Sequence, residues 1–60
     1  MNGEISLAEQ IACVRREIGM RERVYPKWVS AGRMKAETAE RELRAMMAVM
    51  ATLTALRDAE

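Results

Sequence analysis

The only proline of the chain, Pro26, and a glycine that follows it, Gly32, interrupt a sequence otherwise rich in helix-forming residues. A proline ring clashes with the carbonyl group four residues earlier and restricts the residue before it, so Pro26 is expected to end a helix. Proline is also favoured in the first turn of a helix, so one short turn is expected at residues 26–29. Gly32 would close that turn in a left-handed conformation. The pair therefore predicts a corner at residues 25–35 between two helices.

The segment before the corner has a start signal and an apolar stripe. Ser6 and Glu9 form the pattern of a capping box, in which each side chain bonds the backbone amide of the other residue. Apolar residues then recur at helical spacing, which predicts a first helix at about residues 7–24. The stripe consists of Leu7, Ile11, Val14 and Ile18, and Tyr25 and Trp28 would continue it. Arg21 interrupts the stripe, so we expect its guanidinium group to meet an acid.

A second helix is predicted at about residues 36–57. Apolar residues there alternate at spacings of three and four, as in a heptad seam: Ala36, Ala39, Leu43, Met46, Met50 and Leu53. Three further apolar residues, Met47, Val49 and Leu56, widen this stripe. A short corner places consecutive helices antiparallel. The sequence thus predicts one all-α domain, residues 1–60, folded as an antiparallel two-helix hairpin.

The second helix is apolar over too wide an arc for the first helix to cover. A chain of this length also buries only about 60% of its unfolded surface, and small domains commonly need a partner. We therefore expect a homodimer that forms a four-helix bundle. Its candidate interface residues are Leu43, Met46, Met47, Met50 and Leu53. Methionine side chains repack easily, so they suit either an interface or the filling of the hairpin's own core. The alternative is a monomer whose exposed stripe binds another protein.

Four residues are expected to anchor the corner: Tyr25, Pro26, Trp28 and Gly32. Tyr25 and Trp28 would plug the open end of the bundle. Trp28 has a second interpretation as an exposed residue that binds a partner, because tryptophan is enriched at the energetic centres of interfaces.

Positive charge is concentrated in and around the corner. Residues 15–35 carry a net charge of +5 and the remainder −4, which gives the overall +1. The candidate partner-binding residues are Arg15, Arg16, Arg21, Arg23, Lys27 and Arg33. They would contact phosphate groups of a nucleic acid, dock on an acidic protein, or form a solvated helix face. No second helix of the length and spacing of a DNA-recognition helix is evident.

The composition predicts no catalytic, metal or cofactor site. With one cysteine and no histidine, the chain has no intrachain disulfide, no zinc cage and no histidine base to activate Cys13 as a nucleophile. Cys13 is expected to be a half-buried filler residue. The glutamates show no pairing that suggests a catalytic dyad. We therefore expect no enzyme activity and no small-molecule substrate.

No membrane segment or signal peptide is expected. The longest uncharged run, residues 45–56, is twelve residues long, and a bilayer span needs about 20. The N-terminus lacks a basic region followed by an apolar run. A lone thiol fits a reducing compartment, so a cytoplasmic location is expected.

The segment VRREIGMRERVYPKWVSAGRMKAETAERELRAM, residues 14–46, resembles small helical-hairpin proteins encoded by tailed bacteriophages and prophages. The pattern is a Tyr-Pro-x-Trp-Val corner followed by Gly-Arg-Met. The residues that carry it are Arg16, Glu17, Ile18, Arg21, Val24, Tyr25, Pro26, Trp28, Val29, Gly32, Arg33 and Met34. Where such proteins have a capping threonine or serine, this chain has Lys35, so the second helix is expected to start poorly capped, or at Thr38. The methionine-rich tail is particular to this chain.

The resemblance implies an origin more than an activity. Small early phage proteins commonly bind one host protein and block it, so we expect a non-catalytic interaction module that inhibits a host defence or regulatory factor. Two alternatives are a nucleic-acid-binding accessory protein, which would use the basic first helix and corner, and a virion assembly protein.

Overall fold

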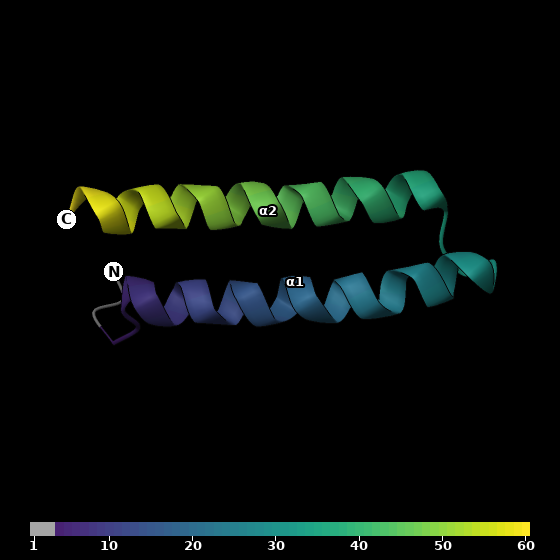
Figure 1. Cartoon of the computed structure of the whole chain (residues 1–60), viewed down its shortest axis with the longest axis horizontal. Coiled ribbons are helices and arrows are strands. Elements are labelled where there is room, and N and C mark those ends of the chain that lie inside the picture. The colour runs from purple at the N-terminus through teal and green to yellow at the C-terminus, as the bar shows by residue number, and fades with distance from the viewer. Residues whose placement is uncertain (1–3) are drawn as a thin grey trace.

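The computed structural model describes residues 4–60, so the first three residues of the predicted domain lie outside it. Within this range the chain forms two helices and no strand: α1 (Leu7–Ser30) and α2 (Ala36–Ala59). The helices lie side by side and antiparallel, with the start of α1 and the end of α2 at the same end of the molecule (Figure 1). The hairpin measures 43 × 17 × 17 Å. The prediction of an all-α two-helix hairpin is confirmed.

α1 begins with the predicted capping box. The Ser6 hydroxyl accepts a hydrogen bond from the Glu9 amide at 3.1 Å, and the Glu9 carboxylate accepts one from the Ser6 amide at 3.0 Å. Two of the four amides that a helix start leaves without a helical partner are thus satisfied. Loss of such a cap typically costs about 1 kcal/mol, so it fixes where the first helix begins.

The predicted end of the first helix, near residue 24, is wrong, because α1 continues through Pro26 to Ser30. The proline has no N–H to offer the carbonyl group four residues earlier, so the helix lacks one hydrogen bond there. The following turn is retained because it places Val29 half-buried between the helices. The short turn predicted at residues 26–29 is therefore the last turn of α1.

Gly32, rather than Pro26, ends α1. Its φ of 76° is the predicted left-handed conformation. The Gly32 amide donates to the Val29 carbonyl at 3.0 Å and the Arg33 amide donates to the Trp28 carbonyl at 2.9 Å. This pair of bonds is a Schellman motif, which satisfies the last carbonyl groups of a helix and turns the chain back.

α2 starts at Ala36 after a weak cap. Lys35 is the N-cap and its side chain makes no capping hydrogen bond, as expected for a lysine, whose ammonium group has no acceptor to offer a backbone amide. A start at Thr38 is wrong, and the helix runs to Ala59, two residues beyond the predicted end. Within residues 4–60, neither helix has a stretch long and apolar enough to cross a membrane.

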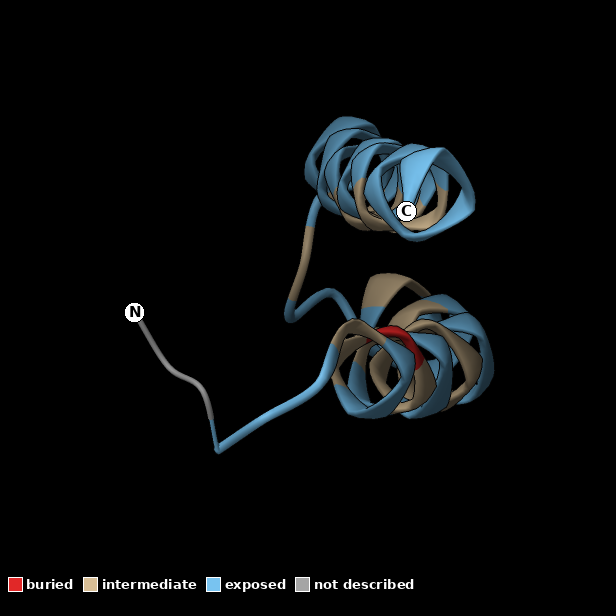
Figure 2. Ribbon diagram, turned by 90° about the vertical axis from the view of Figure 1, so that its left-hand side faces the viewer, coloured by how far each residue is buried: buried red, intermediate tan, exposed pale blue. Residues whose placement is uncertain are grey.

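The core between the helices is thin. Ile11, with 2% of its surface exposed, is the one buried residue among those described (Figure 2). The seam is completed by half-buried residues from both helices: Leu7, Val14, Ile18, Tyr25 and Val29 of α1, and Ala39, Leu43, Met46, Met50 and Leu53 of α2. The predicted stripes are thus in place, with two changes: Ala36 is exposed, and Val29 takes the position expected for Trp28. Trp28 is turned roughly 100° away from Val29 around the helix.

We expect replacement of Gly32 by alanine to destabilise the hairpin by about 1–2 kcal/mol, the cost of the left-handed conformation for a residue with a Cβ. No atom lies within 4 Å of the Cβ that alanine would add, so the loss comes from the backbone alone. Gly32→Asn should retain most of the stability, because asparagine adopts this conformation more readily. Thermal unfolding followed by circular dichroism measures both, and equal midpoints for Gly32→Ala and the wild type would contradict the assignment.

Candidate protein-interaction surfaces

Arg21 lies at the centre of an ionic cluster that joins the two helices. Its Nε donates to Glu17 Oε2 at 2.8 Å on α1, and its Nη1 lies 3.7 Å from Glu42 Oε1 on α2. The same nitrogen donates to the Glu42 backbone carbonyl at 3.4 Å. The expectation that Arg21 meets an acid is confirmed. A charged residue in the apolar stripe is accommodated because two carboxylates reach it.

The charge of Arg21 is insensitive to pH, but its ion pairs are sensitive to salt. The hydrogen bond that Arg21 donates to Glu17 raises the pKa of the Arg21 guanidinium above its already high ordinary value. A raised pKa means that the contribution to stability is lost only as pH rises through that value, so Arg21 stays charged at every physiological pH. The ion pairs are partly solvated, and dissolved ions screen them.

The aromatic residues of α1 stack next to this cluster. The Arg21 guanidinium carbon lies 5.8 Å from the centroid of the Tyr25 ring, and the Tyr25 and Trp28 rings are 5.8 Å apart at their centroids. Tyr25 is half-buried, as expected of a corner anchor. Trp28 is 40% exposed, so its interpretation as a buried plug is wrong.

One long side of the hairpin, the Trp28 edge, is defined by Arg21, Trp28, Glu42, Val49 and Leu56. The ion pair between Arg21 and Glu42 places these two residues on the same side. Helical residues seven apart share a face, so Trp28 follows Arg21 on this edge, and Val49 and Leu56 follow Glu42. Trp28 is 40%, Val49 44% and Leu56 52% exposed. The edge therefore combines an ionic centre with uncovered apolar side chains.

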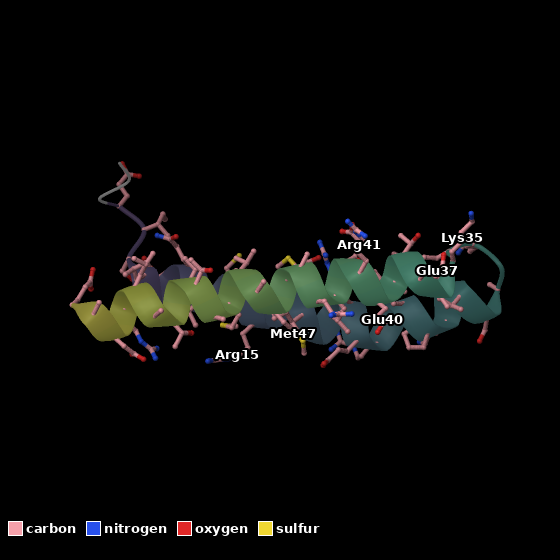
Figure 3. All side chains as sticks on the ribbon, turned by 90° about the horizontal axis from the view of Figure 1, so that it is seen from above. Arg15, Lys35, Glu37, Glu40, Arg41 and Met47 are labelled. Atoms are coloured by element: carbon pink, nitrogen blue, oxygen red, sulfur yellow. The ribbon has the colours of Figure 1, made fainter. Side chains whose placement is uncertain are left out.

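The other long side, the Met47 edge, is defined by Arg15, Glu22, Glu40 and Met47. Figure 3 shows Arg15, Glu40 and Met47 on one side of the molecule. Met47 and Val49 are two residues apart on α2, so they point about 160° apart. Met47 is 48% exposed.

A groove of about 530 Å³ opens between the helices near the corner. Apolar side chains make up most of its lining, with charged residues at the rim: Arg21, Glu22, Tyr25, Pro26, Val29, Ala36, Ala39, Glu40 and Leu43. The lining includes two residues of the Met47 edge, Glu22 and Glu40, and one of the Trp28 edge, Arg21, so the groove lies mainly on the Met47 edge. This edge thus offers a concave apolar surface that continues toward Met47.

Four of the five candidate dimer residues lie in the seam between α1 and α2. Leu43, Met46, Met50 and Leu53 are half-buried, and α1 is the only other element of the described chain that can cover them. Met47 alone of the five is exposed. Because these four side chains face α1, a second copy can contact only their outer flanks, together with Met47. Pairing of two copies through this set stays a prediction.

The candidate basic residues are divided among different surfaces. Arg21 is committed to the ionic cluster and Arg15 lies on the Met47 edge. Arg16, Arg23 and Lys27 are exposed, and their spacings of seven and four place them in one strip on the outer side of α1. Arg33 is exposed in the corner loop.

The chemistry-bearing side chains do not gather at one place. Cys13 is exposed, so its interpretation as a half-buried filler is wrong. It lies on α1 beside Val14, which faces the seam, and points away from α2. Among residues 4–60, no three cysteine, aspartate or glutamate side chains come together as a possible metal site.

Replacement of Arg21 by alanine should lower the midpoint of thermal unfolding by several degrees more than Arg41→Ala does. The Arg21 variant loses two ion pairs and a contact with Tyr25, whereas Arg41 is exposed and belongs to no ion pair within residues 4–60. The difference between the two variants should shrink as salt rises. Circular dichroism melts at low and high salt measure it, and a difference that is absent or independent of salt would contradict the ionic origin.

Comparisons of this chain with protein-family models, curated proteins and solved structures give no match. The resemblance of residues 14–46 to phage and prophage proteins therefore stays a prediction.

Proposed function

We propose that the chain is a non-catalytic protein-interaction module of phage origin. In this proposal two copies form a four-helix bundle in the cytoplasm of the host cell, and the bundle binds and inhibits a host protein. The observation that carries the proposal is the exposed apolar surface that neither helix covers.

The uncovered surface can be expressed as an area. A compact monomer of 6.8 kDa is expected to expose about 4,000 Å². This chain exposes 4723 Å², an excess of roughly 700–800 Å² over that expectation. The excess includes large apolar side chains on both edges of the hairpin. Surface of this kind is typical of chains that bind other proteins.

The Trp28 edge is the surface that best suits a foreign protein. Arginine, tyrosine and tryptophan are enriched at the energetic centres of interfaces, and Arg21, Tyr25 and Trp28 stand in a row on α1. Their mutual stacking and the two ion pairs of Arg21 hold them in place before binding. Less side-chain entropy is then lost when a partner binds. Val49 and Leu56 extend the same surface along α2.

The second candidate function is binding of a nucleic acid through the outer strip of α1. Arg16, Arg23 and Lys27 are exposed and in line, which suits contact with successive phosphate groups. The chain's net charge of +1 supplies little long-range attraction. The strip lies on a different side from Trp28, so single substitutions separate the two functions.

Capture of a host protein should depend on Trp28. The tagged wild-type chain, Trp28→Ala and Ile5→Ala are each used to recover proteins from host lysate, with identification by mass spectrometry. Ile5 is 47% exposed and lies before α1, so it is a control of similar exposure. One host protein should be recovered in equal amounts with the wild type and Ile5→Ala, and reduced at least about tenfold with Trp28→Ala, the typical loss for an interface centre.

Recovery that does not change in Trp28→Ala would contradict the assignment of the Trp28 edge. Recovery of nucleic acid instead, lost in Arg23→Ala and falling steeply with salt, would favour the second candidate function. Helix content by circular dichroism checks that each variant is folded.

A further inference from the structure

We infer that a second copy of the chain packs on the Met47 edge, related to the first by a two-fold axis that runs along the hairpin. The inference rests on the proposed self-association and names its surface and arrangement. In it, α1 of each copy lies antiparallel to α2 of the other. The two grooves then face each other, and their apolar linings form the centre of the bundle near the corner.

The uncovered area fits this occupant. A standard interface buries about 800 Å² of each partner, which is of the same order as the excess of roughly 700–800 Å² that one hairpin exposes over both of its edges. A two-fold dimer uses the same patch on both copies, so each copy buries the same area.

The alignment of α1 with α2 of the second copy follows from the alignment of α1 with α2 within one hairpin. Arg21 and Glu42, whose residue numbers add up to 63, are joined by an ion pair and so lie at one level of the hairpin. Rotation about a two-fold axis parallel to the helices does not change the position of a residue along the length of the hairpin. Residues of α1 and of the second copy's α2 therefore lie side by side when their numbers also add up to about 63.

This register places Met47 of one copy at the level of Arg16 of the other. Ala12, Arg15, Arg16 and Gly19 are spaced three, four and seven apart and so outline one hole on the surface of α1, the arrangement that receives a knob in helix packing. Of these four residues, Ala12 has only a methyl side chain and Gly19 has none. A Cβ on Gly19 would meet only the end of the flexible Arg23 side chain, at 3.9 Å, so the hole is open. The exposed Met47 side chain fills it.

Charge is complementary in the same register. Arg23 and Glu40 of the second copy lie at one level, since their numbers add up to 63, and both are exposed. Within residues 4–60 of its own chain, the one ion pair of Glu40 is a long pair with Arg44, at 3.8 Å between exposed groups. The two-fold axis creates the Arg23–Glu40 pair twice. Such flanking pairs set the partner and the orientation of helices that pack together.

The Trp28 edge offers a second copy little charge complementarity. Arg21 already pairs with Glu17 and Glu42 of its own chain, so these groups have little attraction left for the same groups of a second copy. The Met47 edge has its charges at the rim of the groove instead.

Cross-linking between two different variants tests the arrangement. Both carry Cys13→Ser; one adds Ala12→Cys, and the other, with a larger tag, adds Met47→Cys. The mixed chains are treated with a short bismaleimide and separated by size. Cross-links between the two should form on the order of a hundredfold faster than in a mixture with Val49→Cys, since held thiols have an effective concentration of about 1 mM against roughly 10 μM in solution. Val49 is the matched control, 44% exposed against 48% for Met47.

The wild-type mass, measured by light scattering, separates the possible failures. A mass of one chain at all concentrations would contradict the self-association and this arrangement together. A mass of two chains with cross-linking that favours Val49→Cys, or that links Met47→Cys mainly to itself, would overturn the arrangement and leave the self-association standing. Equal, slow cross-linking in both mixtures would overturn it as well.

Charge reversal supplies a second test. Arg23→Glu and Glu40→Arg should each raise the dissociation constant of the dimer about tenfold, because each places like charges together twice. The double variant should return it to near the wild-type value. Helix content should not change in any of the three, and a double variant that dissociates as readily as the single ones would contradict the cross-copy pair.

Discussion

Two helices that touch along a single seam cannot enclose a core, and the rest of this structure depends on that limit. Each apolar side chain is covered from one direction only, so Ile11 is the one buried residue among those described. The radius of gyration, 13.9 Å, exceeds the value of about 10 Å expected for a compact domain of this length. The stability that a thicker core would supply has to come from local features and from contact with other molecules.

The local features are concentrated at the ends of α1 and in the middle of the seam. The capping box of Ser6 and Glu9 fixes one end, and the Schellman motif at Gly32 fixes the other. Between them, Arg21 links α1 to α2 through Glu42. These interactions determine the register of the hairpin, and the register in turn decides which side chains lie on the Trp28 edge and which on the Met47 edge.

Features that depend on a few neighbouring residues could be predicted from the sequence, and features that depend on the other helix could not. The capping box, the left-handed Gly32, the missing cap at Lys35 and the acidic partner of Arg21 all follow from residue types and spacing. Pro26 was expected to stop the first helix because a lost hydrogen bond and a steric clash are local costs. Contact with α2 retains the turn that follows it, and that gain is invisible in a local pattern.

The division of the exposed residues between the two edges could not be predicted from the sequence either. A spacing of three or four residues fits more than one continuation of a stripe, so Trp28 and Val29 were equally compatible with the seam. The structure selects Val29 and leaves Trp28 toward solvent. In α2, the breadth of the apolar arc was evident, but the ion pair between Arg21 and Glu42 was needed to tell which flank belongs with which side of α1.

The unequal starts of the two helices affect how the hairpin moves. Two of the opening amides at the start of α1 are bonded by side chains, whereas Lys35 makes no side-chain capping bond at the start of α2. The first turn of α2 is therefore held less firmly than the first turn of α1. Ala36 is both in that turn and part of the groove wall. Brief unwinding of that turn would alter the width of the groove at the corner and leave the wall at Leu43 in place.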